Sequence, residues 1–157
     1  MQIQRQFSVF MVNKPGVLAK VLNEFAQAHI NLMAMTMMDS VEHGVMRLVG
    51  ASPDSIRALL DRLNMQYSET DVLCVTLSNQ PGALAAVTQR LSEAHINIAY
   101  AYVTAGARGG KTTGVLKVAD VKKAMRVLQN AGLGASAKAN AKTKGKATIR
   151  RPPTSRR

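Results

Sequence analysis

The stretch that decides the fold is N-K-P-G-V-L, from Asn13 to Leu18, because it returns 66 residues later as N-Q-P-G-A-L, from Asn79 to Leu84. The similarity extends beyond the hexamer: ten of the nineteen positions from Asn13 to Asn31 are identical to their counterparts. A repeat with a fixed period indicates that one supersecondary unit occurs twice. The sequence therefore predicts two related units of about 65 residues, each organised around a turn that opens a helix.

The residue types of this turn suit the binding of an anion. Asn13 is expected to act as the turn or N-cap residue, since its side chain can bond the unpaired N–H groups of a helix N-terminus. Pro15 suits a first helical position, and Gly16 lets the backbone bend and another group come close. Pro81 and Gly82 take these places in the second copy. Free N–H donors at a helix N-terminus favour a carboxylate, and a carboxamide beside them can accept from an ammonium. A free amino acid offers both groups, although the same motif also makes a purely structural strand-to-helix turn.

Hydrophobic periodicity gives the order of elements around the turn. Alternating apolar residues predict a strand before each turn, and a 3.6-residue period predicts a helix after it, ending near His29 or His95. Further strands are expected at about 30–38, 45–51, 96–104 and 112–118, and second helices near Pro53 and Asp120. The order in each unit is β-α-β-β-α-β. It predicts an α+β fold of two ferredoxin-like units, each an antiparallel sheet with its helices on one face.

The two units differ at their last strand. Unit one has a candidate at about 65–68, which runs almost directly into the first strand of unit two. The corresponding segment of unit two, G-L-G-A-S-A at 132–137, is only a weak strand. The sequence leaves open whether this sheet edge of unit two is covered by the C-terminal tail, by another chain, or by nothing.

Charge is distributed unevenly over the expected domains, which are residues 1–69, residues 70–134 and a tail at 135–157. The chain has a net charge of +12, but the tail holds eight Lys or Arg residues and no acid, which leaves +4 for the rest. The tail has almost no apolar content and is expected to be disordered. It is either a solubilising extension or a segment that docks on nucleic acid phosphates or an acidic partner.

Several chemistries are not supported by the sequence. The single cysteine, Cys74, excludes an internal disulfide framework and is expected to be a buried, inert thiol. No Ser-His-Asp or Cys-His arrangement and no metal-ligand spacing is present, so neither catalytic residues nor a metal or cofactor is expected. Residues 106–114 resemble a phosphate loop, but Ala105 stands where that motif needs glycine. No signal peptide or membrane span is evident, so a soluble cytoplasmic protein is expected.

Methionines crowd the second strand expected in unit one. Strict alternation would put Met33, Met35 and Met37 on one face, opposite Leu32 and Ala34. Methionine fills irregular cores, so this face is expected to pack in the core. The alternative is a soft apolar wall for a ligand side chain or for the partner unit.

With this element order and these motifs, residues 1–132 resemble a tandem pair of ACT domains, which are small ferredoxin-like modules that bind amino acids and regulate metabolic enzymes. The residues that support the resemblance are N-K-P-G-V-L with H-I-N-L, and N-Q-P-G-A-L with H-I-N-I. Many ACT domains have glycine where this chain has His29 and His95. In ACT pairs the ligand usually lies between two domains, with the turn of one facing the second strand of the other.

The resemblance implies a non-catalytic, allosteric amino-acid sensor whose ligand lies at the interface of its two units. By likeness to serine-sensing ACT domains, Asn13, Asn31, Asn79 and Asn97 hold the ligand. The full set of expected ligand-binding residues is Asn13, Pro15, Gly16, Val17, Leu18, Asn31, Leu32, Asn79, Pro81, Gly82, Ala83, Leu84, Asn97 and Ile98. The expected partners are a free amino acid, a homodimer and a regulated enzyme, with nucleic acid only through the tail and no membrane.

Overall fold

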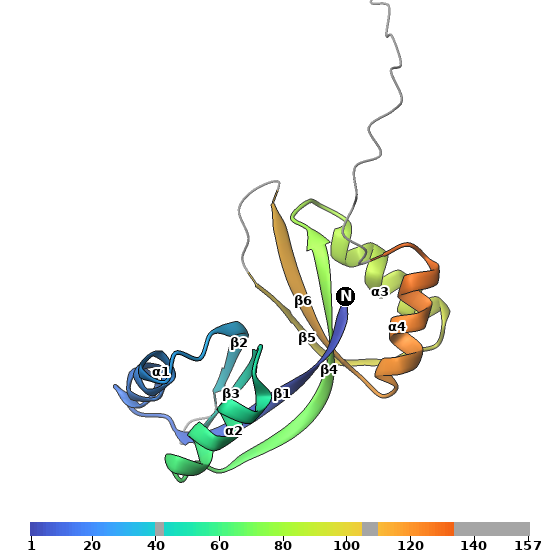
Figure 1. Ribbon diagram of the computed structural model, residues 1–157. Helices are drawn as coiled ribbons and strands as arrows, with labels where there is room; N and C mark the ends of the chain where they lie inside the picture. The colour runs from blue at the N-terminus through green and yellow to red at the C-terminus, as the bar shows by residue number, and fades with distance from the viewer. Residues whose placement is uncertain (40–42, 105–109, 134–157) are drawn as a thin grey trace, which may run out of the picture.

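The computed structural model describes residues 1–39, 43–104 and 110–133 of the chain. The expected tail at 135–157 lies outside these residues, as do most of the two expected hairpin turns and of the weak strand at 132–137. Ten helices and strands form in the described part (Figure 1): β1 (Gln2–Val12), α1 (Val17–Gln27), β2 (Leu32–Asp39), β3 (His43–Gly50), α2 (Pro53–Arg62), β4 (Tyr67–Ser78), α3 (Ala83–Glu93), β5 (Ile98–Val103), β6 (Lys111–Val118) and α4 (Val121–Asn130).

The six strands form one continuous sheet in the order β2-β3-β1-β4-β6-β5, and every neighbouring pair is antiparallel. The predicted α+β fold of two ferredoxin-like units is confirmed. The two units are joined through the long central strands β1 and β4, which have 11 and 12 residues. As predicted, the last strand of unit one continues without a break into the first strand of unit two, and the expected domain boundary at 69/70 falls inside β4.

The last strand of unit two is the beginning of the chain. Residues 2–9 of β1 pair with β4, so the first part of β1 lies beside the first strand of unit two. In the same way, the first part of β4 lies beside the first strand of unit one. None of the three sequence-based alternatives for this edge of unit two was correct. The edge is covered because the units exchange strands reciprocally.

The exchange has a pseudo-twofold centre at the partners Arg5 and Asp71, which are 66 residues apart. Shifting both members of a β1–β4 pair by the repeat length gives another observed pair: Gln2↔Cys74 becomes Ser68↔Ser8. The repeat in the sequence is therefore also a symmetry of the sheet.

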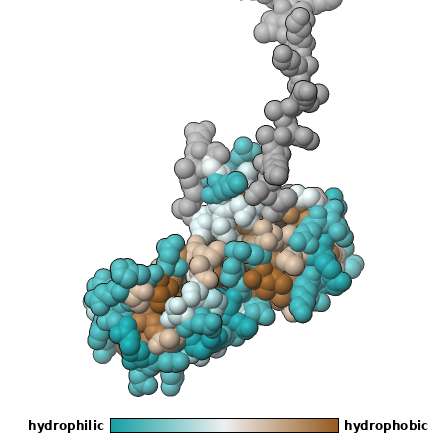
Figure 2. All heavy atoms as spheres, in the orientation of Figure 1, coloured by the Kyte–Doolittle hydropathy of each residue, from teal (hydrophilic) through white to brown (hydrophobic). Residues whose placement is uncertain are grey.

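Each unit has its own hydrophobic core between the sheet and its helices (Figure 1). In unit one, Phe7 and Val9 of β1 pack with Phe25 of α1 and Ile56 of α2. The equivalent core of unit two combines strand residues with α3 and α4, and Ile3 from the start of β1 packs against it. Figure 2 shows apolar residues gathered in two places, one in each half of the molecule. None of the described helices is long and apolar enough to cross a membrane.

The other face of the sheet joins the two units through polar contacts. Gln6 is fully buried there; its Nε2 donates to the Tyr100 hydroxyl at 2.6 Å, and the Tyr102 hydroxyl donates to its Oε1 at 3.1 Å. The Arg47 guanidinium lies 4.0 Å from the centre of the Tyr100 ring. Cys74 lies in the apolar cluster of this face, and burial raises the pKa of its thiol to about 11. The prediction of a buried cysteine is confirmed.

The predicted methionine face of β2 is only partly correct. The pairing of β2 with β3 shifts register between Leu32 and Ala34, so a β-bulge interrupts the alternation. As a result, Leu32 and Met37 pack in the helix-side core of unit one, whereas Met33 packs with Ala34 in the cluster on the other face. The same shift occurs in β5 between Ile98 and Tyr100, at the repeat-equivalent position.

Candidate functional site

The N-x-P-G turns end in a glycine that requires a left-handed backbone. Gly16 and Gly82 both have φ of 85°, which favours glycine because it lacks a Cβ atom. These glycines are the N-cap residues of α1 and α3, and neither helix has a side-chain cap. The expected role of Asn13 as N-cap is therefore wrong, because Pro15 and Gly16 separate it from the helix.

The lack of a side-chain cap leaves backbone donors exposed at both helix starts. Val17 N–H bonds Lys14 and Lys20 N–H bonds Gly16, but the N–H groups of Leu18 and Ala19 have no acceptor in the described part of the chain. At α3 the same holds for the N–H groups of Leu84 and Ala85 within residues 1–39, 43–104 and 110–133. Adjacent free N–H groups at a helix N-terminus suit a carboxylate.

The expected asparagines of one unit lie at opposite ends of a helix. Asn13 precedes α1 and Asn31 follows it, and α1 has 11 residues, which is about 16 Å at the usual rise. Asn79 and Asn97 flank α3 in the same way. A single free amino acid is much shorter than this distance, so it cannot contact both asparagines of one unit.

The two units of one chain do not complete each other's sites either. Val12 lies seven residues beyond Arg5, and Ser78 lies seven beyond Asp71 in the opposite direction. The two turns therefore leave the sheet about 46 Å apart at about 3.3 Å per residue; Figure 1 shows the starts of α1 and α3 at opposite ends of the molecule. β2 and β5 are the two outermost strands of the sheet. The expectation that a single chain holds the ligand at the interface of its own units is wrong for this reason.

Two open pockets lie at the two ends of α3. One, of about 440 Å³, is lined by the turn of unit two and by the ends of β5 and β6, namely Leu77, Ser78, Asn79, Gln80, Ala83, Leu84, Val103, Thr104 and Thr112. The other, of about 420 Å³, is lined by Thr88, Ser92, His95, Ile96, Asn97 and Ile98. The expected residues of unit two thus divide into a turn half and a strand half.

Sequence reasoning missed the hydroxyl groups at the first pocket. The Thr112 hydroxyl donates to the Thr104 carbonyl, and Thr113 N–H donates to the Thr104 hydroxyl at 3.0 Å. The two hydroxyl oxygens lie 3.3 Å apart. Only the pairing of Leu77 with Thr112 across β4 and β6 brings these threonines to the turn, and a sequence alone does not give that register.

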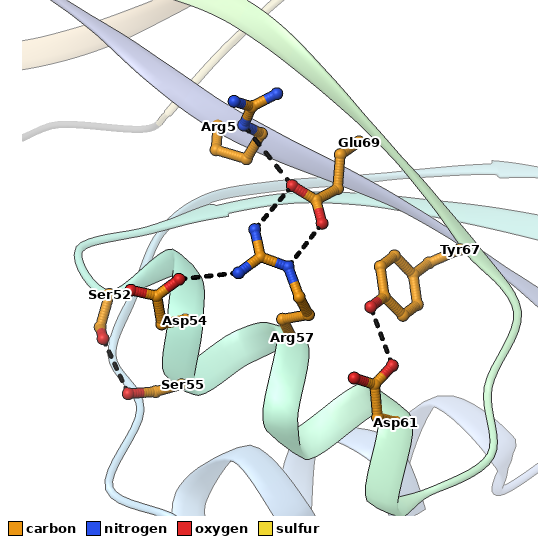
Figure 3. Close-up of polar contacts among 8 residues, drawn as sticks. All are labelled: Arg5, Ser52, Asp54, Ser55, Arg57, Asp61, Tyr67 and Glu69. Atoms are coloured by element: carbon orange, nitrogen blue, oxygen red, sulfur yellow. Dashed lines mark hydrogen bonds and ion pairs between the residues drawn. The ribbon is translucent and has the colours of Figure 1, made fainter.

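A second polar cluster lies near the pseudo-twofold centre (Figure 3). Arg57 of α2 donates to both carboxylate oxygens of Glu69 at 2.8 and 2.9 Å, and Arg5 lies 3.5 Å from the same carboxylate. The hydrogen bonds from Arg57 lower the pKa of Glu69. Repeat equivalents of this cluster are absent because Ile3 stands at the position of Glu69. The cluster fixes α2 against the strands and is separate from the turns.

The fold defines the class of this protein: a tandem pair of ferredoxin-like units that share one sheet. The chain belongs to the ACT domain pair family, whose model matches residues 1–143. The resemblance drawn from the repeated motif is confirmed, and with it the assignment to a regulatory, amino-acid-binding class of domain.

Solved structures agree with this assignment. A Bacteroides thetaiotaomicron protein superposes with a TM-score of 0.77 at 29% identity, over 84% of this chain and 90% of that one. The ligand-free regulatory subunit of aspartate kinase from Thermus thermophilus has a TM-score of 0.61 at 14% identity, over 83% of this chain and 97% of that one, and so shares the fold. No curated protein sequence matches this chain.

Proposed function

We propose that this protein is a regulatory module that binds a free amino acid at its N-x-P-G turns and acts on a partner enzyme without catalysing a reaction itself. The observation that supports the proposal is the pair of free N–H groups in the first turn of α1 and of α3, directly after an exposed asparagine turn. The N–H groups suit the ligand carboxylate, and the asparagine amide suits its ammonium.

We further propose that each site is completed by a second copy of the chain. β2 and β5 each pair with a single strand in the described part of the chain, so each presents a free edge. These edges carry exposed apolar side chains: Met35, Met38 and Val103 are 39%, 47% and 51% exposed. An unpaired, apolar edge suits strand pairing with another chain better than it suits solvent.

Antiparallel pairing of β2 with β2 of a second copy brings the two halves of a site together. A register centred between Met35 and Thr36 sets the partner's Leu32 against Asp39. Asp39 and Met11 both pair with Gly44, so the end of β2 is level with the end of β1. The partner's Asn31 then lies next to Asn13. The same operation at β5 brings the partner's Asn97 to Asn79.

A closed dimer uses one of these edges. Self-pairing at both β2 and β5 would join chains without limit, because the two edges lie on opposite sides of the sheet. One twofold contact gives a dimer with two equivalent sites, one on each side of its axis.

A screen of the twenty amino acids by thermal shift tests the proposal, because a ligand that binds only the native state raises its melting temperature. We expect at least one amino acid to raise it at millimolar concentration, and light scattering to give a dimer. Asn79→Asp is the matched variant: it adds a negative charge beside the ligand carboxylate and should reduce the shift. If no amino acid shifts the melting temperature, the proposed function is wrong.

A further inference from the structure

The two turns are surrounded by different side chains, although they have the same backbone. Met11 pairs with Gly44 in unit one, and its repeat equivalent Leu77 pairs with Thr112 in unit two. Gly44 therefore stands where unit two has Thr112. By the same repeat, Met38 stands where unit two has Thr104.

Methionine fills in unit one the space that a hydroxyl side chain takes in unit two. A Cβ atom on Gly44 would lie 2.6 Å from Met37 Cε and 4.0 Å from Met11 Cγ, so Met37 occupies the place of a side chain at this position. Met37 packs against the buried core of unit one. Its repeat equivalent, Val103, is shorter and 51% exposed at the rim of the unit two pocket.

The strand halves of the sites differ in the same direction. Thr88 and Ser92 line the pocket beside Asn97 in unit two. The repeat equivalents of this threonine and serine in unit one are Leu22 and Ala26. Unit two thus presents hydroxyl groups on both halves, and unit one presents apolar side chains at every equivalent position.

Resting on the proposed function, we infer that the two sites are unequal. The site at Asn79 takes an amino acid with a short side chain that bears a hydroxyl or an amide, held by the hydroxyls of Thr104 and Thr112. The site at Asn13 is closed by Met37 and Met11. Each chain therefore binds one ligand, at unit two, and β5 is the edge at which two copies meet.

Ligand selectivity of the full chain tests the inference directly. Calorimetric titration compares pairs of similar shape: L-threonine with L-valine, L-serine with L-alanine, and L-asparagine with L-leucine. We expect one polar member to bind at least about tenfold tighter than its apolar counterpart, since a site built around hydroxyl groups rejects an analogue that leaves them unpaired. The expected stoichiometry is one ligand per chain. Tighter binding of the apolar members, or two ligands per chain, would overturn the inference while leaving the proposed function intact.

A variant of matched shape identifies the unit involved. Thr112→Val keeps the volume of the side chain and removes its hydroxyl, and it should lower the affinity for the polar ligand about tenfold. Thr113→Val is the control, because Thr113 is the next residue of the same strand and does not line the pocket. Melting temperatures without ligand check folding. An unchanged affinity in Thr112→Val contradicts the inference, and a complete absence of amino-acid binding in the parent contradicts the proposed function as well.

Discussion

Replacing Ile3 by alanine should destabilise the unit to which this residue does not belong in the sequence. Ile3 lies in the first strand of unit one, but it packs against the core of unit two. A fully buried isoleucine costs about 2–5 kcal/mol on truncation to alanine, and Ile3 is half-buried, so we expect about 1–2 kcal/mol. Urea denaturation measures the change in the free energy of unfolding.

Hydrogen exchange shows where the loss of stability occurs. In Ile3→Ala the amides of α4 and of the second half of β4 should exchange faster than in the parent, while those of α1 should keep their protection. Val9→Ala is the matched control, because Val9 lies on the same strand and is buried in the core of unit one. Its effect should appear in α1 and α2. Faster exchange in α1 rather than in α4 on Ile3→Ala would refute the reciprocal exchange of strands.

Three further predictions concern the turn, the ion pair and the tail. Gly82→Ala should lower the free energy of unfolding by about 1–2 kcal/mol in urea denaturation, because φ is 85° and no atom lies within 4 Å of the added Cβ; an unchanged stability would contradict the strained backbone. The folded-state pKa of Glu69 is lowered, so its stabilisation is present above the unfolded pKa of about 4.3 and is lost as the pH falls through the folded value. The stability difference between the parent and Glu69→Gln should therefore shrink below about pH 4, and a constant difference would exclude this linkage. Removing residues 135–157 should leave amino-acid binding unchanged in calorimetry, and a loss of binding would make the tail part of the site.

The repeated motif was sufficient to predict most of the fold. It gave the element order, the continuous strand between the units and the helix ends near His29 and His95, which have φ of 52° and 54°. These features are local, since they depend on periodicity and on turn residues.

The features that the sequence did not predict depend on long-range geometry. The pairing of Gln2 with Cys74 joins residues far apart in the chain, and alternation alone does not specify a register between two amphipathic strands. The bulge at Met33 interrupts an alternation that the sequence suggested was regular. The asparagines were chosen correctly as exposed residues near helix ends, but only the sheet order shows that those of one chain lie too far apart to share a ligand.

Mixing two defective variants tests most directly whether a binding site is formed by two chains. Asn79→Asp damages the turn half of the unit two site, and Asn97→Asp damages its strand half. Each variant alone should bind the amino acid about tenfold to hundredfold more weakly than the parent. A mixed dimer combines the intact Asn79 of one chain with the intact Asn97 of the other, so it should recover one parental site per dimer in calorimetric titration after the two variants are refolded together. If the refolded mixture binds no better than the separate variants, the ligand is not held between two chains and the central claim is wrong.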